Sequence, residues 1–301
     1  MNSRISIVAL CALFGLASPF AQASVNVLAC EPEWQALAEE LGGDRVRADS
    51  ATYAMQDPHH VEARPSLIIK ARDADMLFCT GAELEVGWLP LLLEKSGNRR
   101  VQPGQDGHFL AASQVERLEV PETVDRSQGD VHADGNPHVH LDPRKLLTVA
   151  KAFSARLQII DAENADYYRQ RLSAFSALWT EAMQRWEEQA ASLKGKRAVV
   201  YHKNWSYLLD WLQIETVGDL EPKPGIPPTS GHLSDLLQST RAQDADFILI
   251  ANYQNTRGAR WLADQGDIAL LELPFTVGGS DAAVDLLSLY DAILTRLLTG
   301  D

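Results

Sequence analysis

The sequence predicts an α/β protein of two lobes, each with a mainly parallel sheet, joined by one long bridging helix. Short apolar runs alternate with helix-patterned segments, which is the pattern of parallel sheets with helical crossovers. These runs form two groups, one before about residue 115 and one after about residue 197. The expected strands are Val25–Ala29, Arg45–Ala51, Asp75–Cys79, Ala198–Tyr201, Ile214–Val217, Phe247–Ala251 and Ile268–Leu273.

The bridging helix is predicted by a stripe of apolar residues that recur every three or four positions from Ala162 to Leu193 and stop before Gly195. At the α-helical rise of 1.5 Å per residue, such a helix would be about 45 Å long, which is enough to run along two lobes. A coiled-coil dimer is the alternative explanation of the stripe. The predicted organisation is a leader over 1–23, an N-terminal lobe over 24–155, the linking helix over 156–195 and a C-terminal lobe over 196–301.

A second helix is predicted over Pro143–Ile160, with Asp142 at its N-cap and proline in its first turn.

The charge balance is acidic, with 27 Lys and Arg against 41 Asp and Glu. Nucleic-acid binding needs a basic surface to neutralise phosphates, so we expect no nucleic-acid partner.

The N-terminal residues are typical of a secretory signal peptide. Met1–Arg4 carries one positive charge, Ile5–Ala17 is a short apolar run, and Ala21-Gln22-Ala23 has the small-residue cleavage pattern. We expect cleavage after Ala23 and export to the periplasm. A lipoprotein anchored through a cysteine is the alternative, although Cys11 lies inside the apolar run.

Two cysteines remain after that cleavage, Cys30 and Cys79, and each ends a predicted strand. An oxidising compartment favours a disulfide between them if the two strands are neighbours. Two free buried thiols are the alternative.

Histidines gather beside carboxylates in three places, two of which follow predicted strands. These places are Asp57-Pro58-His59-His60-Val61-Glu62, Asn136-Pro137-His138-Val139-His140-Leu141-Asp142-Pro143, and His202. In open α/β sheets, ligands bind beyond the carboxyl ends of the strands. Neutral imidazole is the commonest zinc ligand, and three histidines with one carboxylate suit tetrahedral zinc.

On these motifs the chain resembles the periplasmic metal-binding proteins of zinc and manganese ABC importers, the cluster A-I solute-binding family. The resemblance covers nearly the whole chain after the leader. By position it implies the metal ligands His59, His138, His202 and Asp281, the last in the loop after the final strand. His60 is not expected to be a ligand, and His140 stands where the family usually has tryptophan. Histidine rather than glutamate at position 202 favours zinc over manganese.

The resemblance further implies a binding protein rather than an enzyme. It would capture Zn²⁺ in the cleft between the lobes and deliver it, as a monomer, to an inner-membrane ABC permease. The segment Gly129–Gly135 is short compared with the histidine-rich loops of many zinc-type members. We expect His132 and Asp134 in this segment to offer a transient metal site that accepts zinc from solution or from a periplasmic zinc donor protein.

Three alternatives remain open at this level. His138-Val139-His140-Leu141-Asp142 matches the His-x-His-x-Asp kernel of zinc-dependent hydrolases, although Pro143 stands where a further histidine is usual. The protein could also bind another exported solute in a similar cleft. Asp281 could serve as the N-cap of a helix over Ala282–Leu298 instead of as a ligand. Whether Asn252 or Glu221, both near strand ends, supports the ligands depends on the tertiary structure.

Overall fold

A computed structural model describes residues 24–123, 129 and 132–300 of the 301-residue chain. The predicted signal peptide over 1–23 lies outside the described residues, as do Asp130 and Val131 of the segment before His138. Among the described residues, no helix combines the length and the apolar character that a membrane crossing requires.

The N-terminal lobe is built on a four-stranded parallel sheet with strand order β2-β1-β3-β4. Its strands are β1 (Val25–Ala29), β2 (Val46–Ser50), β3 (Met76–Cys79) and β4 (His108–Leu110). Its helices are α1 (Pro32–Gly42), α2 (Pro65–Asp73) and α3 (Leu89–Ser96).

The C-terminal lobe repeats this plan with strand order β6-β5-β7-β8, again all parallel. Its strands are β5 (Arg197–Val200), β6 (Glu215–Asp219), β7 (Phe247–Ala251) and β8 (Ala269–Leu273). Its helices are α6 (Ser206–Leu212), α7 (Ser230–Ala242), α8 (Thr256–Gly266) and α9 (Leu286–Thr299). The predicted two-lobed α/β fold is therefore confirmed.

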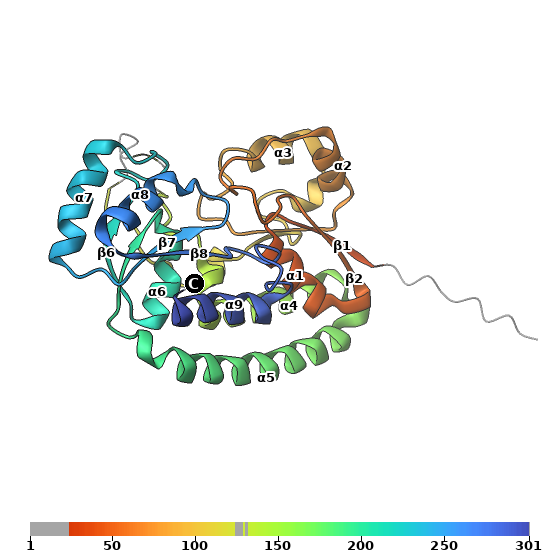
Figure 1. Cartoon of the computed structure of the whole chain (residues 1–301). Helices are drawn as coiled ribbons and strands as arrows, with labels where there is room; N and C mark the ends of the chain where they lie inside the picture. Colours follow the sequence, from red (N-terminus) through yellow and green to blue (C-terminus); the bar gives the residue numbers. More distant parts are fainter. Residues whose placement is uncertain (1–23, 124–128, 130–131, 301) are drawn as a thin grey trace, which may run out of the picture.

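Two helices between the sheets connect the lobes, α4 (Pro143–Ile160) and α5 (Ala165–Gln189). Figure 1 shows α5 running beneath both lobes. Arg171 of α5 reaches Glu40 in α1, and Arg185 reaches Asp291 in α9, so this helix is tied to each lobe. The predicted lobe boundary at residue 155 falls inside α4, which continues to Ile160.

The apolar stripe of α5 is buried within the chain, where it joins a core that spans both lobes. Tyr168, Trp179 and Trp186 of the stripe are inaccessible to solvent. The Trp179 indole nitrogen donates to the Pro143 carbonyl at 2.9 Å, and Trp186 stacks on Tyr290 of α9. The same core holds the inward side chains of β1 and β5, while the opposite faces of the two sheets have separate cores. The face that a coiled-coil partner would need is thus used inside the chain.

Two elements differ from the sequence expectation. Strand β4 was not predicted, because three residues are too few to show a period of two. Helix α9 begins at Leu286 rather than at Ala282, and its N-cap is Asp285 rather than Asp281. Asp285 accepts a hydrogen bond from the Ser288 amide at 2.8 Å, and the Ser288 hydroxyl accepts one from the Asp285 amide at 2.9 Å. This reciprocal capping box sets the helix start one turn later.

The expected disulfide between Cys30 and Cys79 is present. Cys30 directly follows β1 and Cys79 ends β3, and these strands are neighbours in the sheet. Both cysteines are completely buried. The bridge therefore fixes the carboxyl ends of the two central strands of the N-terminal lobe.

Replacing both cysteines, as Cys30→Ala with Cys79→Ala, should lower the free energy of unfolding by about 2 to 4 kcal/mol. The bridge closes a loop over a sequence separation of 49 residues, and its loss frees the unfolded chain. Urea unfolding of the oxidised wild type and of the double variant measures the difference. Wild type treated with a phosphine reductant is the control, and equal stability of its oxidised and reduced forms would contradict the prediction.

Candidate metal centre

Three of the predicted ligands converge from both lobes onto one place. His59 lies in the loop after β2, His138 in the segment before α4, and His202 two residues after the end of β5. The ring centroids are 5.7 Å apart for His59 and His138, 5.6 Å for His59 and His202, and 5.9 Å for His138 and His202. The carboxyl ends of β2 and β5 thus deliver imidazoles to a shared boundary between the lobes.

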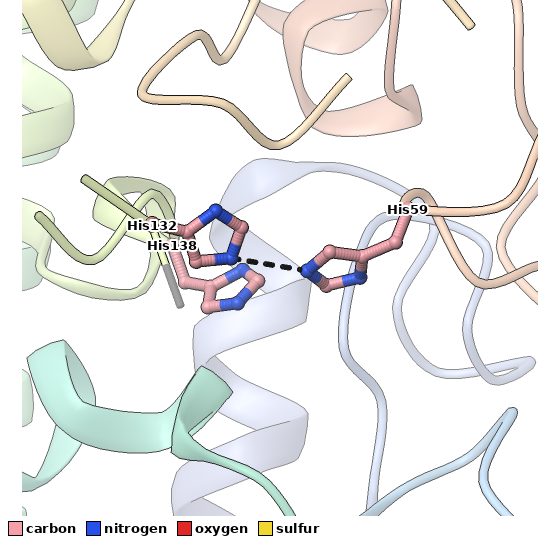
Figure 2. Close-up of side chains that lie close together, drawn as sticks. All are labelled: His59, His132 and His138. Carbon is pink, nitrogen blue, oxygen red and sulfur yellow. Dashed lines mark hydrogen bonds between the residues drawn. The ribbon is translucent and has the colours of Figure 1, made fainter. Parts of the chain in front are cut away.

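A fourth histidine, His132, joins this cluster (Figure 2). Its Nε2 lies 3.3 Å from Nε2 of His59. One ring nitrogen from each of His59, His132 and His138 lies within 4.8 Å of the other two. The sequence suggested only a transient site for His132. Its position a few residues before His138 on the same loop was the signal that it could reach the same centre.

Asp281 and His60 lie outside this cluster. Asp281 is exposed in the turn between β8 and α9, and it is not among the residues that line the two cavities described below. Its role as a ligand stays a prediction. His60 is exposed beside His59, at the edge of the smaller cavity.

Carboxylates orient two of the clustered rings. Oδ1 of Asp57 lies 2.8 Å from Nδ1 of His59, and Oε2 of Glu221 lies 2.7 Å from Nδ1 of His202. A carboxylate at Nδ1 holds the ring proton there and leaves the Nε2 lone pair available, which is the usual support of a metal-binding histidine. Glu221 therefore supports a candidate ligand. Asn252 instead donates to the Gly279 carbonyl at 2.7 Å.

His138 is held differently, through its backbone and by packing. Its amide donates to Oδ1 of Asn136 at 3.0 Å, and Nδ2 of Asn136 donates to the Lys203 carbonyl at 2.7 Å. The ring lies edge-on to Phe275 at 5.5 Å. The side chain is 1% exposed, and neither ring nitrogen has a hydrogen-bond partner among the described residues. Such buried, unpaired nitrogens are costly unless something binds them.

A glycine allows the turn that brings this segment to the cluster. Gly135 has φ of +94°, and a Cβ there would lie 2.9 Å from the Val120 side chain and 3.0 Å from the Leu118 carbonyl. The next amide, that of Asn136, donates to the same Leu118 carbonyl at 2.8 Å. Between His132 and Gly135, the Ala133 amide donates to Oε2 of Glu83 at 2.5 Å.

Burial keeps the inner rings neutral. Desolvation is the main cause that lowers the pKa of His138 well below its usual value, and electrostatic interactions with His59 and His202 lower it further. The same causes lower the pKa of His132 to about 3. Burial acts to raise the pKa of Asp57, but its contacts with His59 outweigh burial and lower it. Neutral imidazoles beside ionised carboxylates are the protonation states that a cation requires.

A cavity of about 750 Å³ opens onto the cluster and carries several acidic side chains. Among its lining residues are His132, His138, His202, Glu119, Asp219, Glu221 and Lys203. A second cavity of about 210 Å³, lined in part by Asp57, His59 and Tyr253, meets the same centre near His202. Carboxylates around such openings raise the local concentration of cations.

The hydrolase kernel does not assemble into one site. Nε2 of His140 lies 3.0 Å from the Phe275 carbonyl, so the ring donates there. Asp142 caps α4 and accepts three hydrogen bonds from the Arg144 guanidinium, at 2.9, 3.2 and 2.8 Å. Among the three residues of the kernel, only His138 lies in the histidine cluster.

The sequence matches the family described as zinc-uptake complex component A, periplasmic, over residues 27–300. The chain belongs to this family. Relatives include the manganese ABC transporter substrate-binding lipoprotein PsaA of Streptococcus pneumoniae, 25% identical over 80% of this chain and 76% of the relative. The metal ABC transporter substrate-binding lipoprotein ScbA of Streptococcus cristatus is 26% identical over 65% of this chain. The match spans 64% of ScbA and 44% of the related SloC of Streptococcus mutans.

Solved structures of other proteins share the fold. A crystal structure of ZnuA has a TM-score of 0.74 at 20% identity, covering 92% of this chain and 98% of that one. A manganese-bound periplasmic metal-binding protein from Candidatus Liberibacter asiaticus has a TM-score of 0.75 at 16% identity, covering 92% of this chain and 99% of that one. The two-lobed architecture of this family member is therefore that of known metal-binding proteins.

The metal-free protein should lose stability in acid because of His138. Its pKa is lowered on folding, so the unfolded chain takes up a proton there that the folded chain does not. Between about pH 7.5 and about pH 5.5, this residue alone should reduce the free energy of unfolding by about 1 kcal/mol. Urea unfolding at both pH values, for wild type and His138→Asn, measures the effect. An equal loss in the two proteins would contradict it.

Proposed function

We propose that this protein captures Zn²⁺ between its lobes and delivers it to an inner-membrane ABC permease. The observation that carries the proposal is the convergence of His59, His138 and His202 from both lobes. Carboxylates lie at Nδ1 of His59 and His202, and both ring nitrogens of His138 are unpaired among the described residues. Membership of a family of zinc-uptake components supports the same class of function. The metal is the cargo in this proposal, and no reaction is performed on it.

Zinc is proposed over manganese because of the donor atoms. The cluster offers imidazole nitrogens, which suit Zn²⁺, whereas Mn²⁺ prefers sites rich in carboxylate and water oxygens. The name of the pneumococcal relative gives manganese as its metal. Family membership therefore leaves the choice of metal to the donor set of each chain.

His59, His138 and His202 are proposed as three ligands, with two candidates for the fourth. His132 already lies among the other rings, 3.3 Å from His59. Asp281, the ligand predicted from sequence, is exposed in the turn between β8 and α9. Closed tetrahedral coordination by four protein ligands fits a protein that holds zinc without performing chemistry on it.

Release and delivery follow from ligands that come from both lobes. Coordination ties the two lobes together, so the loaded and empty forms differ in how firmly these loops are held. The permease is proposed to distinguish the two forms by that difference. We also propose that the mature protein acts as a monomer in the periplasm, after loss of residues 1–23. In this position it can receive zinc from solution or from a donor protein.

The direct test is metal stoichiometry after removal of bound metal with a chelator. Wild type should bind one tight Zn²⁺ per chain and Mn²⁺ more weakly, as measured by elemental analysis and competition titration. Alanine substitution of His59, His138 or His202 should lower zinc affinity by more than the roughly 10- to 100-fold typical for loss of a supporting carboxylate.

The variants His132→Ala and Asp281→Ala, compared side by side, identify the fourth ligand. The one that weakens zinc binding to the same degree as His59→Ala holds that position. His60→Ala is the matched control, since it removes the neighbouring exposed imidazole. Tight zinc binding that survives loss of both His59 and His202 would overturn the proposed function.

Glu221→Gln should weaken zinc binding about 10- to 100-fold without changing the stoichiometry. The amide cannot hold the proton on Nδ1 of His202 as firmly as the carboxylate does at 2.7 Å. Competition titration of the variant against wild type measures the change. Glu215→Gln, a change at an exposed carboxylate of the same lobe, serves as the control. Unchanged affinity in Glu221→Gln would remove this residue from the site.

A further inference from the structure

A chain of buried polar contacts joins the two lobes beside the histidine cluster. Oε2 of Glu33, at the start of α1, accepts a hydrogen bond from the Thr276 hydroxyl at 2.5 Å. Oε1 of Glu33 lies 3.2 Å from Nδ1 of His140. Nε2 of His140 lies 3.0 Å from the Phe275 carbonyl. Glu33, His140 and Thr276 are 1%, 2% and 4% exposed, so these contacts are closed to bulk water.

The three segments in this chain come from different parts of the fold. Glu33 belongs to the N-terminal lobe, His140 to the segment that crosses between the lobes, and Phe275 and Thr276 follow β8 in the C-terminal lobe. The Tyr290 hydroxyl of α9 adds a fourth contact by donating to the His140 carbonyl at 2.5 Å. A buried carboxylate is expensive unless it is paired, so Glu33 favours the lobe arrangement that supplies its partners.

The ring of His140 has a defined role in this chain. A carbonyl can only accept, so Nε2 of His140 carries a hydrogen and donates to Phe275. Its Nδ1 faces Oε1 of Glu33 at 3.2 Å, a close contact that lacks the geometry of a hydrogen bond.

The contacts matter for the site because His138 lacks the support that its neighbours have. Asp57 and Glu221 orient His59 and His202, whereas the ring nitrogens of His138 have no hydrogen-bond partner among the described residues. The ring of His138 rests edge-on against Phe275, and the ring of His140 meets the same phenyl group at 4.9 Å. Phe275 therefore accepts a hydrogen bond from His140 at its carbonyl and packs its ring against His138.

We propose that Glu33, His140 and Thr276 form an interlobe clamp whose function is to position His138 for the metal. These are positioning residues that do not touch the cargo. The clamp rests on the proposed function for its purpose, but its effect on the metal-free protein can be measured separately. Loss of the clamp should leave the number of metal sites unchanged and loosen the segment that carries His138.

The test uses the full mature protein and compares substitutions at two buried threonines, Thr276 in the clamp and Thr240 away from it. Thr276→Val removes the hydroxyl that donates to Glu33, and Thr276→Ser restores it. Thr240→Val is the matched control: Thr240 is 1% exposed and donates to the Leu237 carbonyl at 3.1 Å, within α7. Both valine variants lose one buried hydrogen bond, but only one of these bonds belongs to the clamp.

The first measurement is amide hydrogen exchange in the metal-free proteins. The Leu141 and Asp142 amides donate to the carbonyls of His138 and Val139. Their exchange should be about 10-fold faster in Thr276→Val than in Thr240→Val, since the segment opens locally once its anchor is weakened. Thr276→Ser should behave as wild type. Equal exchange in the two valine variants would overturn the clamp, whatever the protein binds.

The second measurement is zinc affinity and the visible spectrum of the Co²⁺-substituted protein. Thr276→Val should bind zinc about 10-fold more weakly, through faster dissociation, with an altered Co²⁺ spectrum. Thr240→Val should keep wild-type values for both. An equal loss of zinc affinity in both valine variants would mean that losing any buried hydrogen bond weakens binding, and it would overturn the positioning role. If wild type itself bound no metal tightly, the proposed function would fail, and hydrogen exchange would still decide the clamp.

Discussion

The histidine cluster depends on packing four imidazoles at close range, where burial disfavours charge on the inner two. His59, His132, His138 and His202 have ring centroids between 5.3 and 6.4 Å apart where they meet, and protonation of one disfavours protonation of the next. Burial opposes charge on His132 and His138. The carboxylates of Asp57 and Glu221 lie against Nδ1 of the other two rings. Together these contacts hold four imidazoles at one place between the lobes.

The lobes are positioned by packing as well as by this cluster. The inward faces of β1 and β5 share one apolar core with α4, α5 and α9, so the two sheets are not independent bodies joined by a flexible linker. Ion pairs from α5 to α1 and α9 add to this connection. Local shifts of the loops that carry the histidines are therefore more consistent with this fold than a wide hinge motion. The clamp between Glu33, His140 and Thr276 applies the same constraint at the site itself.

Most of the fold could be predicted from the sequence because its elements carry strong local signals. Phe247–Ala251 is a continuous apolar run and Val25–Ala29 is apolar except for Asn26, as expected for parallel strands covered on both faces. Pro143 after Asp142 marks the start of α4, and the stripe of α5 is long enough to identify. The start of α9 was missed because Asp281 and Asp285 are both acceptable caps. The pairing of Asp285 with Ser288 decides between them.

The sequence by itself determined the two lobes, the disulfide and the convergence of His59, His138 and His202. Hydrophobic periodicity indicates the lobes, two cysteines at strand ends of an exported chain favour the disulfide, and the family resemblance singles out the three histidines. Only the tertiary structure decided the surroundings of these rings. It brought His132 into the cluster, assigned Glu221 to His202, and directed His140 away from the cluster to Glu33 and Phe275. The physical reason is that these contacts join residues far apart in the chain, and their geometry depends on how two lobes pack against a shared core.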